Sequence, residues 1–248
     1  NTANFMHTTL ANDLKVANTQ LILPKLGITR YTGLNGAFDV PNMAELTAYF
    51  VAEDAASTVV SITDNKATLT PRFIAANQVF SKQYLNQTSP QIQNQLIAQF
   101  MFSIEKGIEQ EVSNALSGLT ESNATLSAAT WSNILALANY VPYNNAWVSS
   151  RTQMAALKAT GKATYQGGFI WQDGEIDGVP AFASSLVPST HIYTGDFSQI
   201  AVGEWDGGLL ILTDPYTNKS KGKIDIQVSA LRDAKVLNSA AFAKMVIG

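Results

Sequence analysis

The stretch TSPQIQNQLIAQFMFSIEKGIEQEVSNALSG, residues 88–118, is the longest uninterrupted periodic segment of the chain. Ser89 is suited to cap a helix with Pro90 in its first position, and Gly118 is suited to end it. A helix over 90–116 would be roughly 40 Å long at about 1.5 Å per residue, so we expect it to act as a spine. Apolar residues recur at every fourth position, which indicates one helix face: Ile92, Leu96, Phe100, Ile104, Ile108, Val112 and Leu116.

The residues in the middle of this segment lead to three further predictions. Gly107 costs about 1 kcal/mol relative to Ala in a helix, so we expect a kink or a close backbone crossing there. The run Phe100-Met101-Phe102 is apolar all round and predicts cover on more than one side. Three carboxylates, Glu105, Glu109 and Glu111, fall on the polar side, where a solvated face is expected.

Composition bounds the kind of protein. A chain of 248 residues is long enough for one domain or two closely packed subdomains. Its net charge of −3 and its 14% of charged residues are unlike a strongly basic nucleic-acid binder or an acidic disordered tail. Amides are abundant instead, with 18 Asn and 14 Gln. This composition suits a surface largely occupied by neighbouring molecules, because charge is costly to desolvate.

Several classes of site are excluded by what the sequence lacks. There is no Cys, which excludes disulfides, thiol catalysis and cysteine-ligated metals, and His7 and His191 are the only histidines. No apolar run reaches the roughly 18–20 residues of a membrane span, so no membrane contact is expected. No signal peptide is recognisable. The first residue is Asn rather than Met, from which we expect a chain that is processed or trimmed at its start.

The search for catalytic motifs finds none. Neither a Gly-rich phosphate loop nor a Gly-x-Ser-x-Gly elbow is present, and His191 falls in a Pro-Ser-Thr loop, where a surface or interface histidine is expected. We therefore predict no enzyme and no catalytic, cofactor-binding or metal-binding residue. A hydrolase that uses loop carboxylates is a distant alternative, because their spacing is non-specific: Asp173, Glu175, Asp177, Glu204 and Asp206.

The first third of the chain contains an arm and a hairpin signal. Residues 1–30 lack an amphipathic period and predict an extended arm that lies along another surface, although a disordered terminus fits the composition equally well. Asp64-Asn65 predicts a turn between a strand over 57–62 and a return strand that carries Ala67, Leu69 and Phe73. A two-stranded ribbon alone is marginally stable in water, so its apolar residues need a partner surface.

The rest of the chain mixes short helices with strands. A helix with Trp131 and Ile134 on one face precedes a buried strand at 146–148, and Ser150 with Gln153 starts a further helix that stops at Gly161. A hairpin with a strand over 179–183 follows, and then strand candidates at 200–202, 209–212, 224–228 and 234–237 and an apolar end at 242–246. Without a regular alternation of strand and helix, the expected fold class is α+β.

The order of these elements resembles the major capsid proteins of tailed bacteriophages, with the Hong Kong 97-type fold. The resemblance covers nearly the whole chain, and it depends on the co-linearity of motifs that are each weak alone. The motifs are Leu21-Ile22-Leu23-Pro24, Phe50-Val51-Ala52-Glu53, Ala146-Trp147-Val148-Ser149-Ser150, Asp177-Gly178-Val179-Pro180 and Gly195-Asp196-Phe197.

The resemblance implies a division of the chain. Residues 1–30 correspond to the N-terminal arm and 31–75 to the extended E-loop hairpin. Residues 76–119 and 216–248 correspond to the peripheral domain with the spine helix, and 120–215 to the axial domain. The apolar ribbon is then expected to pack on a neighbouring subunit. The predicted subunit-interface residues are Leu21, Leu23, Tyr49, Phe50, Val59, Val60 and Leu69.

The resemblance also implies the function. The chain is expected to self-assemble through pentamers and hexamers into an icosahedral virion capsid around double-stranded DNA, assembled in the cytoplasm of a bacterial host. Near-neutral charge fits a shell that confines DNA with only non-specific contact. A portal, a maturation protease that removes an N-terminal scaffolding segment, and decoration proteins are the expected partners.

One departure concerns covalent cross-linking. In the cross-linking members of this family a Lys on the E-loop bonds to an Asn near the last strands, with a Glu assisting. The corresponding positions here are Ser57, Gly222 and Ser229, so we predict no such cross-link. Lys66 is a displaced donor if the register differs.

Two other functions stay open at this stage. An encapsulin-type compartment shares the fold but encloses protein cargo. A secreted adhesin or glycan-binding module is suggested by the Asn and Thr content, by three glycosylation sequons, and by Trp131, Trp147, Trp171 and Trp205. Aromatic residues in such number are more often part of a core.

Overall fold

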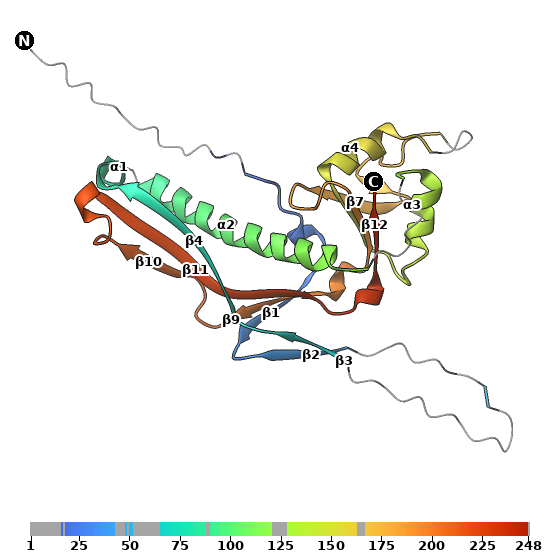
Figure 1. The fold of residues 1–248 in the computed structure, drawn as a ribbon, viewed down its shortest axis with the longest axis horizontal. Helices are drawn as coiled ribbons and strands as arrows, with labels where there is room; N and C mark the ends of the chain where they lie inside the picture. Colours follow the sequence, from blue (N-terminus) through green and yellow to red (C-terminus); the bar gives the residue numbers. More distant parts are fainter. Residues whose placement is uncertain are drawn as a thin grey trace, which may run out of the picture.

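The computed structural model of the chain describes residues 16, 18–42, 48, 50–51, 65–87, 90–120, 128–162 and 167–247. Its helices are α1 (Lys82–Gln87), α2 (Pro90–Ser117), α3 (Trp131–Ala138) and α4 (Arg151–Ala159). The body is elongated, with α2 along most of it and α3 and α4 together at one end (Figure 1). The predicted spine helix is confirmed, since α2 has 28 residues and begins at Pro90. The predicted cap at Ser89 lies outside the described residues.

The strands form two sheets and a two-stranded ribbon. The first sheet contains β1 (Thr29–Leu34), β9 (Ile200–Trp205), β11 (Lys223–Val236) and β10 (Leu210–Asp214) in that order, and β4 (Arg72–Ser81) also pairs with β11. The second contains β12 (Phe242–Val246), β8 (His191–Gly195), β5 (Ala146–Ser150), β7 (Val179–Ser184) and β6 (Glu175–Ile176). The ribbon is β2 (Phe38–Asn42) with β3 (Asn65–Leu69), and it projects from the body (Figure 1). The α+β class is confirmed.

β11 organises the first sheet because its 14 residues run past the other strands. On one edge, residues 223–232 pair antiparallel with β4. On the other edge, the first half of β11 pairs with β10 and the second half with β9. The sequence predicted separate segments at 224–228 and 234–237, and the structure joins them into one strand.

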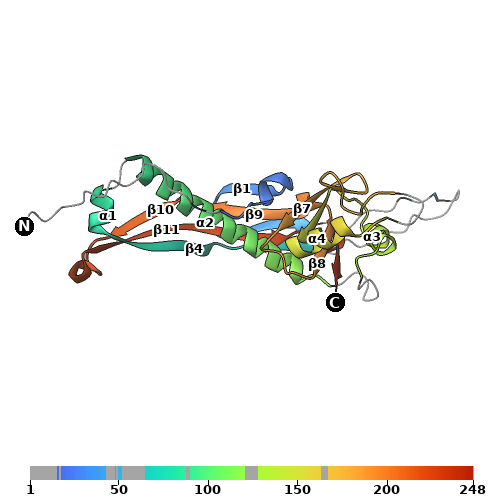
Figure 2. The same cartoon turned by 90° about the horizontal axis from the view of Figure 1, so that it is seen from above.

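One face of α2 packs on β4 and β11. The predicted stripe is buried from Phe100 to Leu116, where its five members are at most 9% exposed. At Gly107 the approach is close, since a Cβ atom there would lie 2.5 Å from Cδ1 of Ile74 in β4. Viewed from above, α2 crosses the strands obliquely (Figure 2). The close crossing expected at Gly107 is confirmed, but Met101 is half exposed, so the described residues do not cover the helix there on every side.

Three apolar clusters form the core. The main cluster joins α2, the first sheet and part of the second, and it includes Ile108, Val148, Val202 and Phe242. The second lies under α3 and α4 around Trp147, and the third lies at the base of the ribbon around Leu69. All four tryptophans belong to these clusters or pack against them, as expected for core aromatics.

Over its described residues, the N-terminal arm is not the extended segment that the sequence predicted. Ile22, Leu23 and Leu26 are buried in the main cluster around a single 3₁₀ turn, and β1 begins at Thr29. This part of the predicted arm therefore folds onto its own chain. The physical reason is that three apolar side chains within five residues find an apolar face on α2.

The structure differs from the predicted hairpin at its turn. Asn65, expected in the turn, pairs with Asn42 in a strand, and the partner of β3 is β2, whose strand character was missed. The predicted return strand is broken after Leu69, because Pro71 interrupts it and Phe73 belongs to β4. The predicted strand over 57–62 lies outside the described residues.

The predictions for the second half are largely confirmed. α3, β5, α4, β7, β9, β10 and β12 lie where the sequence placed them, and the Ser150 side chain accepts from Gln153 N–H as the N-cap of α4. His191 begins β8 and does not lie in a loop. The sheets divide the chain differently from the predicted domain ranges. β9 and β10, from the range 120–215, belong to the sheet of α2, and β12, from 216–248, belongs to the sheet of α3 and α4.

Candidate assembly surface

An ion network ties β1 to the rest of the first sheet. The Arg30 guanidinium lies 2.8 Å from a Glu105 oxygen in α2 and 3.0 Å from a Glu204 oxygen in β9. Glu204 also lies 3.4 Å from Arg232 in β11. The hydrogen bond that Arg30 donates to Glu105, together with the charges of both carboxylates, raises the pKa of Arg30 despite its partial burial. Glu204, one of the loop carboxylates considered as an acid or base, is thus a structural partner of two arginines.

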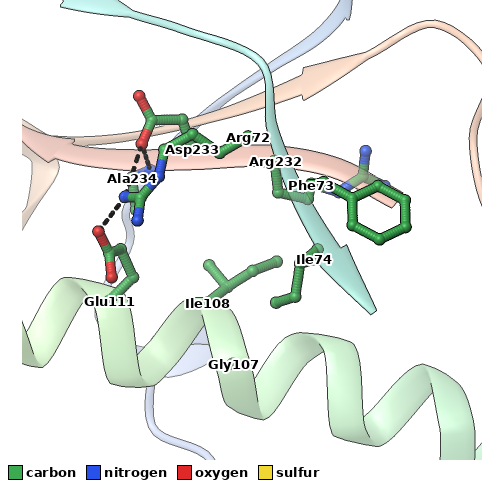
Figure 3. A pocket seen from close by; sticks show the side chains of 9 residues that line it. All are labelled: Arg72, Phe73, Ile74, Gly107, Ile108, Glu111, Arg232, Asp233 and Ala234. Atoms are coloured by element: carbon green, nitrogen blue, oxygen red, sulfur yellow. Dashed lines mark hydrogen bonds and ion pairs between the residues drawn. The ribbon is translucent and has the colours of Figure 1, made fainter. Parts of the chain in front are cut away.

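A second charge cluster lies where β4 crosses β11 (Figure 3). Arg72 forms a very short ion pair with Glu111 of α2 and lies 3.6 Å from the buried Asp233 carboxylate. The same carboxylate accepts from Thr70 N–H at 3.0 Å. Beside these charges lies a pocket of about 210 Å³, into which Ile74 points toward Gly107. The cluster fixes the start of β4 against α2.

Glu109 is the main correction on the polar side of α2. Its side chain was expected in solvent, but the residue is 3% exposed. The carboxylate accepts from Ile22 N–H at 2.7 Å, from Leu23 N–H at 3.4 Å and from the Ser184 hydroxyl at 2.6 Å. Glu109 therefore joins α2 to the folded arm and to the end of β7, and so helps to hold both sheets in one body.

The face of the first sheet opposite α2 is open. Residues 74, 76 and 80 of β4 face the helix, and Phe80 packs against Phe100 of α2. The alternate residues of β4 and their cross-strand neighbours on β11 and β10 point to the other side. That side carries large exposed apolar residues: Phe73 at 66%, Val79 at 40%, Leu210 at 53%, Leu212 at 49% and Leu231 at 37%. Apolar area of this kind on a sheet marks an interaction surface.

β10 forms one edge of this open face. Its only ladder in the described part of the chain is with β11, so its second edge is not paired there. Leu210, Ile211 and Leu212 are each close to half exposed, although Ile211 pairs with the buried Val228 and so lies on the face that carries α2. An apolar strand with a free edge is prone to association unless another chain covers it.

The base of the ribbon is fixed to the first sheet. Trp205 Nε1 donates to the Gly36 carbonyl at 2.6 Å, and the Asn42 amide donates to the Leu237 carbonyl at 2.9 Å. Lys235 Nζ donates to the Thr68 carbonyl at 2.6 Å. These contacts aim β2 and β3 away from the body, as Figure 1 shows, so the ribbon is held as an outward extension.

The predicted interface residues separate into groups. Phe50 is fully exposed, and Leu21 is partly buried. Leu23 and Leu69 are 2% and 0% exposed, packed in their own chain, so their side chains have no surface left for a neighbour. The side chains of three further members lie outside the described residues: Tyr49, Val59 and Val60. The sequence missed the open face of β4, β11 and β10, because the apolar residues at 73–76 and 209–212 are consecutive and do not alternate with polar ones.

Two of the three predicted cross-linking positions lie in the described part of the chain, in different environments. Gly222 is exposed with φ of 63°, and Ser229 is buried at 1% exposure on β11. Ser57 lies outside the described residues. The alternative donor, Lys66, lies with its Nζ 2.6 Å from an Asp39 oxygen across the ribbon. Hydrogen bonds from Lys66 and then from Thr68 lower the pKa of Asp39.

The candidate catalytic groups are not brought together. His191 Nδ1 lies 2.7 Å from the Tyr193 hydroxyl. Among the residues that the structure describes, no three His, Cys, Asp or Glu side chains gather as a metal-binding group would require. Over the same residues, no helix is both long enough and apolar enough to cross a membrane. His7 lies outside the described part.

Comparison with known proteins gives one family. The sequence model of the phage capsid family matches residues 14–247. A major capsid protein of Halomonas phage phiHAP-1 is 23% identical over 254 aligned positions, which cover 92% of this chain and 41% of that protein. The chain thus spans about two fifths of the length of this curated relative.

Solved structures agree in fold. The capsid of a native GTA particle has a TM-score of 0.78 at 13% identity, covering 99% of this chain and 96% of the other. The structure titled Mycobacterium phage Che8 has a TM-score of 0.70 at 12% identity, with 98% and 97% covered. The similarity to these chains therefore extends over the arm, both sheets and the ribbon.

Proposed function

The chain belongs to the phage capsid family, and on this premise we propose that it is the structural subunit of an icosahedral shell around double-stranded DNA. The observation that carries the proposal is the open apolar face of β4, β11 and β10, which a neighbouring subunit would cover. Exposed apolar area of this extent is costly for a protein that stays monomeric. In a closed shell, every subunit has a neighbour that can cover this face.

The finer features are part of the same proposal. We place the subunits in pentamers and hexamers, with assembly in the cytoplasm of a bacterial host and a portal, a maturation protease and decoration proteins as partners. Phage relatives favour a DNA-filled shell over an encapsulin-type compartment. The net charge of −3 suits a wall that meets DNA non-specifically, since phosphate binding grows with the number of Lys and Arg contacts.

The interface test places one new charge on each side of the same strand. Leu212→Glu adds a carboxylate to the open face, and Thr213→Glu adds the same group to the opposite face of β10. We expect the first variant to stay a folded monomer or capsomer, because burying an unpaired carboxylate is costly, and the second to assemble. Negative-stain electron microscopy and sedimentation velocity measure the outcome, and circular dichroism checks folding.

Two results would contradict this assignment. Shells of normal diameter from Leu212→Glu would show that the open face is not an interface. A wild-type chain that stays monomeric at every concentration and salt would contradict assembly itself. Mature particles run on a denaturing gel should give a single monomer band, because the cross-linking groups are absent.

A further inference from the structure

The second sheet has an open strand edge at the end of β7. On one side of β7, residues 181–184 pair in parallel with β5. On the other side lies β6, which has two residues and pairs only with Val179 and Pro180. The last contact on this side is from Ala181 N–H to the Gly174 carbonyl at 2.8 Å. Beyond it, no described strand continues along β7.

The direction of the Ala183 backbone groups follows from the geometry of a β-strand. N–H and C=O of one residue point to the same side, and the following residue points to the other. Because Ala181 directs its N–H away from β5, Ala183 directs its N–H and C=O the same way. Neither group has a partner outside the strand ladders in the described part of the chain. One donor and one acceptor are thus presented at this edge.

A groove of about 500 Å³ runs along this edge. The folded arm forms one wall, α4 forms the other, and Met154, Trp171 and Phe182 contribute apolar surface. Lys25 lines the groove from the arm and Arg151 from the start of α4. No Asp or Glu lines it among the described residues, and neither cation has an ion-pair partner there. The groove therefore carries two positive charges and no described negative charge.

We propose that this groove binds an extended acidic peptide segment of another protein, which adds as a strand to the open edge of β7. Strand addition uses the free N–H and C=O of Ala183, and acidic side chains of the segment meet Lys25 and Arg151. Apolar side chains of the segment pack on Phe182 on one face of the sheet and on Met154 on the other. A phosphate backbone would satisfy the cations but not the Ala183 carbonyl, since phosphate oxygens without hydrogen only accept. This site is separate from the open face and does not depend on shell assembly.

The probe is a capped six-residue peptide, Glu-Glu-Val-Val-Glu-Glu, which presents Glu and Val on both faces of an added strand; it carries a fluorescein label, is titrated with the full chain and is followed by anisotropy. We expect saturable binding that weakens as salt is added. Lys25→Glu with Arg151→Glu should weaken binding at least about tenfold, because both attractions become repulsions. Lys106→Glu, at an exposed position of α2 outside the groove, is the matched control and should leave binding unchanged.

Two further variants test the strand addition itself. Ala183→Pro removes the free N–H, and proline is tolerated on strand edges, so binding should fall while the circular dichroism spectrum is kept. The same peptide with alternate backbone amides N-methylated should not bind, and this arm needs no change in the protein.

Four outcomes would overturn the proposal. The first is no saturable binding at millimolar peptide, and the second is equal binding of the N-methylated peptide. The third is displacement by a short DNA duplex with the same dependence on Lys25 and Arg151, which would assign the groove to phosphate. The fourth is self-association without peptide that Ala183→Pro abolishes, which would assign it to a second copy of the chain.

Discussion

Glu109 places an ionisable group inside the main apolar cluster, where three hydrogen bonds replace its water. The lining around it is Ile22, Leu26, Val112, Val187 and other uncharged residues, with no cation among those described. Such a group stabilises the fold only while all its donors are in place, because a buried polar atom without a partner costs free energy. Glu109 therefore links α2 to the backbone of the arm, in addition to the burial of Ile22, Leu23 and Leu26 in the main cluster.

Glu109→Gln tests this fastening. The amide nitrogen cannot accept, so either the backbone donors of Ile22 and Leu23 or the Ser184 hydroxyl loses its acceptor. We expect the free energy of unfolding to fall by about 1–3 kcal/mol, measured by urea denaturation. Hydrogen exchange should also speed up over 18–28. Glu111→Gln removes an exposed ion pair instead and should cost below about 1 kcal/mol. Equal losses in the two variants would contradict this role for Glu109.

Burial of Tyr193 makes the folded state less stable at alkaline pH. Its side chain is fully buried in β8, and burial raises the pKa of its hydroxyl well above the ordinary 10.0. The unfolded chain releases this proton near pH 10, whereas the folded chain keeps it. The unfolded state then binds fewer protons, so stability must fall as the pH rises above about 10.

Tyr193→Phe should therefore flatten this fall in stability between about pH 9 and pH 11. The variant loses the contact with His191 Nδ1, so it starts from lower stability at neutral pH. Urea denaturation at several pH values gives the slope. Tyr216→Phe, at a residue 76% exposed, is the control and should keep the wild-type slope. The same slope in Tyr193→Phe and wild type would disprove the assignment.

At the scale of elements, the crossing of α2 over β4 decides how closely the helix lies on the sheet. Gly107 admits Ile74 where any larger residue would collide with its Cδ1 atom. This glycine destabilises the helix by about 1 kcal/mol relative to alanine. In Figure 3 the ring of Phe73, the preceding residue in β4, lies on the other side of the strand from Ile74.

A double-mutant cycle tests the crossing. Gly107→Ala in the wild type gains helix propensity but overpacks against Ile74, at a cost of about 1–3 kcal/mol. In an Ile74→Val background the colliding methyl is gone, and the same change should stabilise by about 1 kcal/mol. Thermal and urea unfolding of the four proteins measure the coupling. Additive effects would show that the two residues do not interact.

At the scale of the whole molecule, the main cluster makes one body of the two sheets. It contains Ala230 and Ala234 from the first sheet together with Val148, Tyr193 and Phe242 from the second. Helix α2 and the folded arm lie in the same cluster. Elements that share one continuous core unfold together.

Calorimetry on the non-assembling Leu212→Glu variant should therefore show one transition, with equal calorimetric and van't Hoff enthalpies. Two separate transitions would mean that the sheets are independent domains. Phe242→Ala is expected to lower the midpoint of the whole transition and not of one part, because Phe242 stacks edge-on with Phe197 inside the shared cluster.

The sequence by itself determined the elements whose signal is local. The four-residue period predicted α2, the capping side chain of Ser150 predicted the start of α4, and alternation predicted the first part of β11, because each of these depends on neighbours within a few residues. The order of such elements was enough to indicate the family of folds. Most of the second half was readable for this reason.

Only the tertiary structure decided what depends on partners far apart in sequence. Glu109 looked solvated because its donors lie 87 and 75 residues away, at Ile22 and Ser184. The pairing of β3 with β2, the burial of Leu23 and Leu69, and the open face all depend on which strand lies beside which. A strand shows its alternation in the sequence, but which of its two faces a helix covers is set by packing alone.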